Sequence, residues 1–364
     1  MRVKLEDVCE RGSSNLKQSD VIDKAGEYPV YGATGYLGNV DFYHQEKPYV
    51  AIVKDGAGIG RTTLHPSKSS VIGTMQYLLP KENVLPEYLC YVVRYMHLEK
   101  YFTGATIPHI YFKDYKNEEF NLDTLDRQIE IVGILKKVEN IIELRRQEIE
   151  KLDDVIKARF VEMFGNPDTE WPLVTIAEIC SNTRTGPFGS SLHHDEFVDE
   201  GVFVLGIDNA VENKFSYNRM RYITEEKYQQ LKRYTVYPGD VIITIMGTVG
   251  RAAVIPEDMP KAINTKHLAC LSPNFNVVDS YFLCNAFQIH PEIKRQLQEQ
   301  TKGAIMAGLN LTVIRGLKFK LPPLERQKQF VEFYKQVDKS KVVIQKSFDE
   351  MQLLFDGLMQ KYFG

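Results

Sequence analysis

The chain has no long apolar run. No window of its 364 residues approaches about 18 uncharged apolar residues, the length that marks a membrane-spanning helix, and the amino-terminal stretch MRVKLEDVCERG has no apolar signal core. Membrane insertion and export are therefore not expected, and we predict a cytoplasmic location.

Paired metal or disulfide cysteines are missing too. The five cysteines are widely scattered without a C-x-x-C pair, which argues against a zinc knuckle and a disulfide framework, so we expect reduced, mostly buried thiols. The stretch LHHDEF, with His193, His194 and Asp195, offers adjacent ligand types, but adjacent side chains point in different directions and no second cluster completes a site. No metal site is expected.

Catalytic motifs are also lacking. KDGAGIGRTT resembles a phosphate loop without its Gly-Lys-Ser/Thr ending, and GNPDTE lacks the paired proline and aromatic that would clamp a flipped base. VYGATGYLG, with Gly32, Gly35 and Gly38, matches a dinucleotide fingerprint, which needs a strand before it and a helix after it; the flanking residues supply neither. We predict a chain that is not itself an enzyme, with a nucleotide-binding dehydrogenase kept as an alternative.

A basic excess is absent: 45 Lys and Arg stand against 48 Asp and Glu, a net charge of -3. Phosphate affinity comes from Lys and Arg, so nucleic-acid binding would depend on where the cations lie. Basic residues do mix with tyrosines and glycine-rich turns, a combination that suits phosphate contacts and base-edge readout. The candidate DNA-binding residues are Lys54, Arg61, Thr62, Lys68, Arg184, Ser190, Arg219, Arg221, Thr248, Arg251, Lys266 and His267.

What the chain does contain is a duplication. FNLDTLDRQIEI at 120–131 and FKLPPLERQKQF at 319–330 share one pattern at an offset of 319 − 120 = 199, which holds without a gap from 104–165 to 303–364. Upstream the match is looser: GIGRTTL from Gly58 pairs with TVGRAAV from Thr248. Each half is therefore a variable globular region followed by a similar helical segment.

Each helical segment carries apolar residues at heptad spacing, which predicts two long helices that pair in an antiparallel coiled coil. We predict an α+β fold: two mixed α/β domains (1–118 and 167–318) joined by two helical spacers (119–166 and 319–364) with pseudo-two-fold symmetry. In the first helix, one seam is assigned to Ile131, Val138 and Leu152, and the other to Ile134, Ile141 and Val155. The candidate interface for helix pairing or partners is Leu125, Arg127, Gln128, Ile131, Val138, Leu152, Leu324, Arg326, Gln327, Phe330, Val337, Ile344 and Met351. A coiled-coil adaptor that does not bind DNA is a second alternative.

Two variable regions, each followed by an L-x-R-Q-x-x-I/F-V rod, resemble the specificity subunit of type I restriction-modification enzymes. YPVYGATG, DGAGIGR, GPFGSSL, YPGDVIITIMGTVGRAAV, GAIMAGLNLTVIRGLKFKLPPLERQ and LMQKYFG are similar to stretches that recur in that family. The similarity covers nearly the whole chain, and the rod motifs are its most specific part.

The resemblance implies two target-recognition domains that each read one half of a split, asymmetric DNA sequence. It further implies two methyltransferase subunits and restriction/translocase subunits as protein partners. S-adenosylmethionine, ATP and Mg would then be bound by those subunits and no cofactor by this chain.

Overall fold

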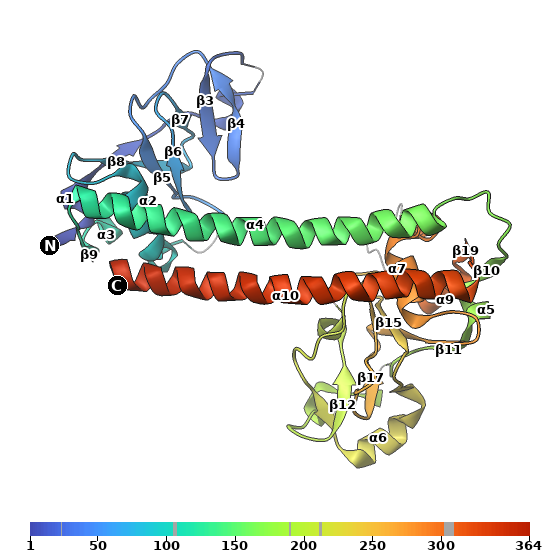
Figure 1. Ribbon diagram of the computed structural model, residues 1–364. Helices are drawn as coiled ribbons and strands as arrows, with labels where there is room; N and C mark the ends of the chain where they lie inside the picture. Colours follow the sequence, from blue (N-terminus) through green and yellow to red (C-terminus); the bar gives the residue numbers. More distant parts are fainter. Residues whose placement is uncertain (23, 105–107, 189–190, 211–212, 302–308) are drawn as a thin grey trace. The chain divides into compact units, whose positions relative to one another are not determined.

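The computed structural model describes residues 1–364 except 23, 105–107, 189–190, 211–212 and 302–308. The chain forms two compact units, Met1–Glu148 with Ile344–Gly364, and Ile149–Val343. Two helices of 40 residues, α4 (Leu125–Phe164) and α10 (Leu324–Phe363), each contribute to both units. We call the part of each unit that precedes its long helix a head: residues 1–124 form head 1 and residues 165–323 form head 2 (Figure 1).

Head 1, as far as the structure describes it, consists of short strands with three short α-helices and two 3-10 turns. Its strands are β1 (Arg2–Lys4), β2 (Cys9–Ser13), β3 (Tyr28–Gly32), β4 (Gly35–Val40), β5 (Tyr49–Val53), β6 (Thr62–His65), β7 (Ser70–Val71), β8 (Met75–Pro80) and β9 (Glu119–Asn121). Its helices and 3-10 turns are α1 (Leu5–Val8), η1 (Gln18–Asp20), α2 (Pro86–Tyr95), η2 (Leu98–Tyr101) and α3 (Phe112–Tyr115).

Head 2 has the same succession of elements with an insertion. Its strands are β10 (Leu173–Thr175), β11 (Cys180–Thr185), β12 (Val202–Leu205), β13 (Tyr222–Ile223), β14 (Thr235–Val236), β15 (Val241–Thr244), β16 (Ala252–Val254), β17 (Ala262–Asn264), β18 (Leu268–Pro273) and β19 (Lys318–Lys320). Its helices and 3-10 turns are α5 (Ile176–Ile179), η4 (His194–Glu196), η5 (Ile207–Asn209), α6 (Glu225–Leu231), η6 (Lys232–Tyr234), α7 (Ser280–Ile289), α8 (Pro291–Thr301) and α9 (Leu311–Gly316). Among the described elements, η5, α6, η6 and β14 of head 2 have no counterpart in head 1.

The two heads share one sheet topology. The order β2-β8-β5-β6 in head 1 repeats as β11-β18-β15-β16 in head 2, and β4-β3-β7 repeats as β13-β12-β17 with β14 added. Even the parallel pairing is repeated, β3 with β7 and β12 with β17, in otherwise antiparallel sheets. The duplication seen at the ends of the two halves therefore extends through the heads, where the sequences have diverged.

The fingerprint GATGYLG forms a hairpin. Gly32 ends β3 and pairs with Gly35 at the start of β4, so a strand follows where a dinucleotide site needs a helix. This geometry removes the dehydrogenase alternative.

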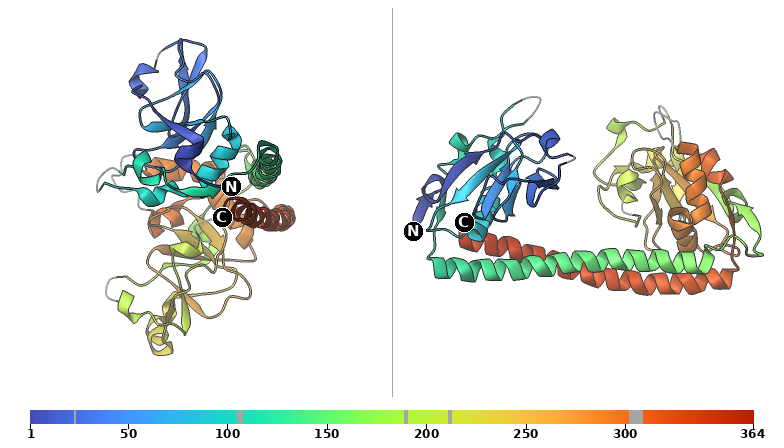
Figure 2. Two further views of the ribbon diagram at one scale, coloured as in Figure 1. Left: turned by 90° about the vertical axis from the view of Figure 1, so that its left-hand side faces the viewer. Right: turned by 90° about the horizontal axis from the view of Figure 1, so that it is seen from above.

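Stretches of α4 and α10 pack side by side in opposite directions within each unit (Figure 2). In unit 1, Ile131 and Leu135 near the start of α4 share a core with Phe363 near the end of α10. In unit 2, Phe160 near the end of α4 packs edge-on against Phe330 near the start of α10, with ring centroids 5.1 Å apart. The predicted antiparallel pairing of two long helices is confirmed.

One predicted seam is wrong. Ile134, Ile141 and Val155 are 37%, 39% and 46% exposed. The helix also packs on its own head, so the buried side chains, such as Ile131, Val132, Leu135 and Val138, form a wider face than a coiled-coil seam requires. The predicted spacers at 119–166 and 319–364 likewise include short strands, β9 and β19, that precede each helix and pair with β1 and β10.

None of the described helices is both long and apolar enough to cross a membrane.

Candidate nucleic-acid interface

The glycine-rich turn of head 1 lies at one edge of its sheets. Val53 at the end of β5 donates its backbone N–H to the carbonyl of Arg61 at 2.9 Å, which closes the turn, and the next residue, Lys54, donates to the carbonyl of Thr74 at 3.0 Å. The turn is thereby joined to the segment that follows β7. Lys54, Arg61 and Thr74 are brought to one edge from three positions in the sequence.

Head 2 repeats this edge. Thr244 at the end of β15 donates to the carbonyl of Arg251 at 2.8 Å, and the next residue, Ile245, donates to the carbonyl of His267 at 2.9 Å. These bonds place Arg251 at the position of Arg61, as the pairing of GIGRTTL with TVGRAAV predicts. Lys266 and His267 follow the end of β17, so they lie at the same edge.

The side chains at this edge of head 1 are engaged. Arg61 donates through Nη1 to the carbonyl of Ala33 at 2.9 Å, which links the β5–β6 turn to the β3–β4 turn. The ammonium group of Lys54 is 3.7 Å from the carboxylate of Asp55, whose other oxygen lies 2.6 Å from Nδ1 of His109. Head 1 therefore presents an edge of mixed charge.

The edge of head 2 is richer in available cations. Arg251 and Lys266 are exposed, and neither side chain has a hydrogen bond or ion pair with any residue that the structure describes. Arg221 donates to Asp208 at 2.6 Å, and the guanidinium of Arg219 is 3.8 Å from the same carboxylate. The single carboxylate of Asp208 thus faces two guanidinium groups. The summed charge of the side chains named at this edge is positive.

His267 is neutral near pH 7. Burial lowers its pKa first, and the neighbouring charges of Lys266 and Arg221 lower it further. A neutral imidazole has one donor and one acceptor nitrogen, so it can form hydrogen bonds with a base edge. The neighbouring Lys and Arg side chains carry the positive charge that attracts phosphate.

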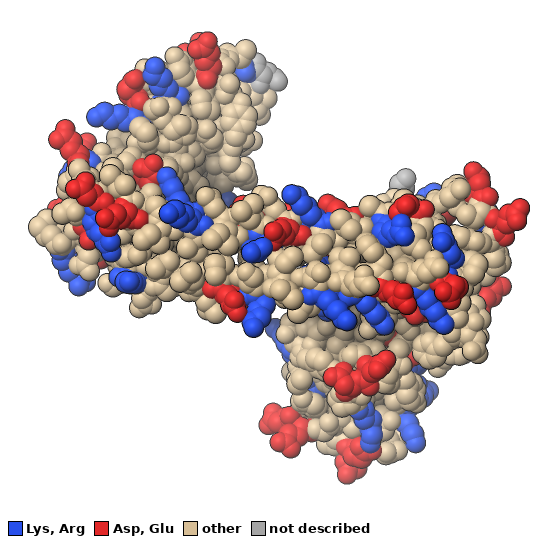
Figure 3. All heavy atoms as spheres, viewed as in Figure 1, with Lys and Arg blue, Asp and Glu red and all other residues tan. Residues whose placement is uncertain are grey.

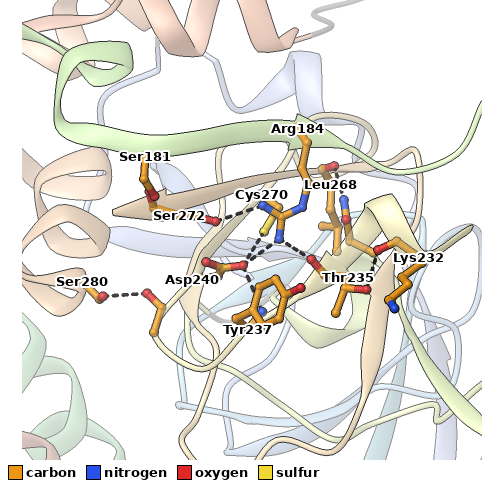
Figure 4. A network of polar contacts seen from close by, with 12 residues as sticks. Ser181, Arg184, Lys232, Thr235, Tyr237, Asp240, Leu268, Cys270, Ser272 and Ser280 are labelled. Atoms are coloured by element: carbon orange, nitrogen blue, oxygen red, sulfur yellow. Dashed lines mark hydrogen bonds and ion pairs between the residues drawn. The ribbon is translucent and has the colours of Figure 1, made fainter. Parts of the chain in front are cut away.

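Arg184 has a structural role and is not available to DNA. Its side chain is 10% exposed and lies 2.8 Å from the carboxylate of Asp240, which is 4% exposed. It also donates to the carbonyl of Thr235 and to Oγ of Ser272, the latter at 2.9 Å (Figure 4). Since Arg184 is on β11 and Thr235 is on β14, the guanidinium joins the two sheets of head 2.

Several other sequence candidates lie away from the edge or contribute only backbone. Thr62 is buried and its hydroxyl donates to the carbonyl of Gly60 at 3.0 Å. Lys68 follows β6, on the far side of that strand from Arg61. Thr248 is exposed in the β15–β16 turn, where its carbonyl accepts from the hydroxyl of Thr244. Ser190 lies outside the described residues.

The mixed basic and aromatic residues of head 2, from Tyr217 to Tyr234, are divided between buried, partly buried and exposed positions. Tyr228 is buried in the head, Lys227 pairs with Glu196 at 2.5 Å, and Arg233 donates to the hydroxyl of Tyr234 at 2.6 Å. The periodicity of α6, which turns Tyr228 inward, explains why these residues do not form one reading surface.

Sequence reasoning missed exposed apolar side chains at the edge. Met246, in the turn between β15 and β16, is 52% exposed, and Phe188 is 59% exposed. Phe188 follows Gly186, where a Cβ would meet the carbonyl oxygen of Asn264 at 2.1 Å, so its segment passes directly beside the end of β17. In the sequence, the signal that could have identified them is a large apolar residue close to a turn glycine.

The glutamines of the repeated Arg-Gln motif are not on a surface. Gln128 and Gln327 are both 0% exposed, whereas Arg127 and Arg326, the residues before them, are exposed. The other candidate interface residues divide into Ile131, Val138 and Phe330, which are buried, and Leu125, Leu152, Leu324, Val337, Ile344 and Met351, which are partly or fully exposed.

Charge elsewhere is mixed. Figure 3 shows acidic and basic side chains interspersed over the face it presents, so the net charge of -3 is not gathered in one patch there. Among the described residues no group of three or more His, Cys, Asp or Glu side chains is placed to hold a metal ion. Burial raises the pKa of Cys9, Cys90, Cys180 and Cys284 to about 12, so these thiols are poor nucleophiles.

Comparison with known proteins gives one consistent result. The family model described as type I restriction modification DNA specificity domain matches residues 1–154 and 169–349. The type I restriction enzyme MjaVIII specificity subunit of Methanocaldococcus jannaschii is 22% identical over 311 residues, which cover 79% of this chain and 72% of that protein.

Solved structures agree with the fold. The type I restriction-modification S subunit from M. genitalium matches with a TM-score of 0.62 and 16% identity, over 100% of this chain and 96% of that one. A chain from a structure of complex assembly in the type I R-M system matches with a TM-score of 0.58 and 15% identity, over 100% and 97%. The chain belongs to the type I restriction-modification DNA specificity family.

Proposed function

We propose that each head of this chain reads one half of a split DNA target through the edge that carries Arg61 in head 1 and Arg251 in head 2. The observation that carries this proposal is the repeated edge itself. The same backbone hydrogen bonds hold an arginine at the same place in both heads, while the side chains around it differ. Two half-sites of different sequence require the same backbone structure with different side chains at the reading edge.

Family membership confirms the function predicted from the sequence at its general level. The chain is a DNA-recognition subunit of a type I restriction-modification complex, and its homologues are named as specificity subunits of type I restriction enzymes. The prediction that it is a recognition subunit and not itself the enzyme is confirmed by the same family.

Two methyltransferase subunits and the restriction/translocase subunits are the proposed protein partners. Apolar side chains that the described chain leaves exposed on the long helices support docking there: Ile129 and Leu144 on α4, and Val343 and Leu353 on α10, are 58% to 73% exposed. Exposed apolar groups on a helix gain free energy when a partner covers them. S-adenosylmethionine, ATP and Mg are proposed to be bound by those subunits, because this chain's own contribution is recognition.

The proposal is tested first on the host genome. Long-read methylation sequencing compares the native host with the gene intact and deleted, and we expect adenine methylation to disappear at one split sequence motif. The motif would reveal both half-sites together. An unchanged methylome, combined with failure of the chain to co-purify with a methyltransferase, would contradict the proposal.

Arg251→Ala tests the edge directly. If the guanidinium reads a base, its loss should weaken binding of the assembled complex to its cognate duplex by about 1–3 kcal/mol, with a smaller effect on random duplex. If Lys266 instead contacts a phosphate, Lys266→Ala should weaken binding to both duplexes alike and reduce the salt dependence of binding by about one counterion. Fluorescence anisotropy over a series of salt concentrations would measure both effects.

Lys261→Ala is the matched control. Lys261 precedes β17, at the opposite end of the strand from Lys266, and it pairs with Glu225 at 3.1 Å. Its replacement should leave DNA affinity unchanged. Equal losses for Lys261→Ala and Lys266→Ala would show that the edge has no special role.

A further inference from the structure

The repeated Arg-Gln motif places a glutamine at the same point of each long helix. Gln128 is the fourth residue of α4 and Gln327 the fourth residue of α10. Both side chains are fully buried, which is unusual for glutamine and requires that the amide find partners.

Gln128 makes three hydrogen bonds to backbone. Its Oε1 accepts from the N–H of Leu85 at 2.8 Å, and its Nε2 donates to the carbonyls of Asn83 at 3.0 Å and Asp123 at 2.9 Å. Both amide donors are used, and Oε1 has an acceptor role as well. One side chain thereby holds the segment before α2 and the entrance to α4.

Gln327 repeats the arrangement in unit 2. Its Oε1 accepts from the N–H of Asp279 at 2.9 Å, and its Nε2 donates to the carbonyls of Val277 at 3.1 Å and Pro322 at 2.8 Å. Leu85 and Asp279 are the N-cap residues of α2 and α7, so the bonded positions correspond as well.

All six partners are backbone groups. The residues that supply them differ between the units, with Leu85 against Asp279 and Asp123 against Pro322. Hydrogen bonds to backbone groups do not depend on which side chains the head carries. The sequence of the head can therefore change while the glutamine still connects the head to its long helix. The neighbouring arginines bond locally on the helix surface, as Arg127 does to Glu130 at 2.6 Å.

We propose that Gln128 and Gln327 are positioning residues for split-site recognition: each fixes the direction in which a long helix leaves its head and so sets the number of base pairs allowed between the half-sites. This rests on the proposed function of the heads. It adds that spacing is governed by two buried amides, whereas base choice is governed by the edges that carry Arg61 and Arg251.

The test uses the assembled complex of this chain with its methyltransferase. Gln128→Met and Gln327→Met keep side-chain length and remove the hydrogen bonds. Methylation rates are measured on duplexes with the native spacer and with spacers longer or shorter by one base pair. We expect the preference for the native spacer to fall by about tenfold, which corresponds to about 1.4 kcal/mol of lost positioning, while base preference within each half-site is unchanged.

Gln147→Met is the matched control, because Gln147 lies on α4 and, among the described residues, its side chain bonds only to the side chain of Glu143, at 2.7 Å. It should keep the spacer preference of the unaltered protein. Gln128→Asn and Gln327→Asn keep the amide but shorten its reach, and they replace the Met variants if those do not assemble.

The outcomes separate the two proposals. No methylation of any split sequence by the unaltered complex would refute the recognition function itself. Normal methylation by the unaltered complex, with unchanged spacer preference in the variants, would overturn the positioning role alone. Failure of all four variants to assemble would also overturn it, since the glutamines would then serve folding and not spacing.

Discussion

The two heads join their sheets with different chemistry at equivalent positions. In head 2, Arg184 on β11 stands opposite Cys270 on β18 and reaches the carbonyl of Thr235 on the second sheet. In head 1, Gly12 stands opposite Tyr77, whose hydroxyl accepts from the N–H of Val71 on the second sheet at 2.9 Å. A guanidinium that donates to the added strand β14 and a tyrosine hydroxyl that accepts from β7 thus each connect the two sheets of their own head.

The two heads place the large side chain on opposite strands of the pair. A Cβ on Gly12 would lie 3.0 Å from Cβ of Tyr77, so the tyrosine occupies the room that a side chain at position 12 would need. Head 2 has the large side chain on the other strand, where Arg184 faces the small Cys270. The two solutions differ in how well they pair their polar groups, since Nε of Arg184 is buried without a hydrogen-bond partner among the described residues. Both units, by contrast, use the same glutamine at the joint to the long helix.

The largest expected difference between the heads comes from removing one partner of the ion pair. Asp240→Ala leaves the buried guanidinium of Arg184 without a carboxylate, and the N–H of Tyr237 loses its acceptor at 3.0 Å. We expect a loss of about 3–5 kcal/mol in the stability of unit 2. Tyr77→Phe removes one hydroxyl and should cost unit 1 about 1–3 kcal/mol. Urea unfolding followed by hydrogen exchange in each unit would measure both.

A double replacement sharpens this comparison. Arg184→Leu combined with Asp240→Leu removes both charges and should recover most of the stability lost by Asp240→Ala. A double variant as unstable as the single one would mean that the ion pair itself, and not the unpaired charge, sets the loss.

The sequence predicted the repeat, the long helices and the matching of Arg61 with Arg251, because these depend on local pattern and on similarity between the two halves. It could not predict the role of Arg184. The partner Asp240 is 56 residues away, and only the folded sheets bring the two together. The role of Gln128 was hidden for another reason: its partners are backbone atoms, which leave no signature in residue types.

The helix seam was mispredicted for a physical reason as well. A heptad pattern finds apolar spacing but does not say which neighbour covers each position. Ile131 and Leu135 are covered by the head and by α10 together, which leaves Ile134 outside.

Acid should destabilise both heads through one buried histidine each. Burial lowers the pKa of His65 and of His290 to about 4, so the folded protein binds fewer protons than the unfolded chain between about pH 4 and 6.5. Stability is full above about pH 6.5 and falls as the pH decreases through this window, by about 1.4 kcal/mol per pH unit and per histidine. Urea unfolding from pH 5 to 8 would show the slope.

Replacing each histidine separates the heads. His65 is stacked on Tyr49 and lies 2.7 Å from the hydroxyl of Thr63, whereas the ring of His290 packs against Phe160 and Phe319. His65→Phe should flatten the pH dependence of unit 1 alone and His290→Phe that of unit 2 alone. An unchanged slope in either variant would show that other groups cause it.

The smallest expected difference lies in the two glycines that precede the matched arginines. Gly60 and Gly250 have φ of +80° and +84°, so alanine at either position should cost about 1–2 kcal/mol of backbone strain. A Cβ on Gly60 would also lie 2.7 Å from the backbone nitrogen of Glu99, whereas nothing lies within 4 Å of one on Gly250. Gly60→Ala should therefore destabilise its unit more than Gly250→Ala does, by about 1–3 kcal/mol from overpacking.

Thermal unfolding of the two variants would measure this difference, with Gly133→Ala as control. Gly133 is in the interior of α4 with open space around its Cβ position, so alanine there should stabilise the helix by about 0.5–1 kcal/mol. Equal losses for Gly60→Ala and Gly250→Ala would mean that η2 moves aside at low cost. The turn of head 1 would then be as free to adjust to DNA as the turn of head 2, and the difference between the two edges would reduce to their charged side chains.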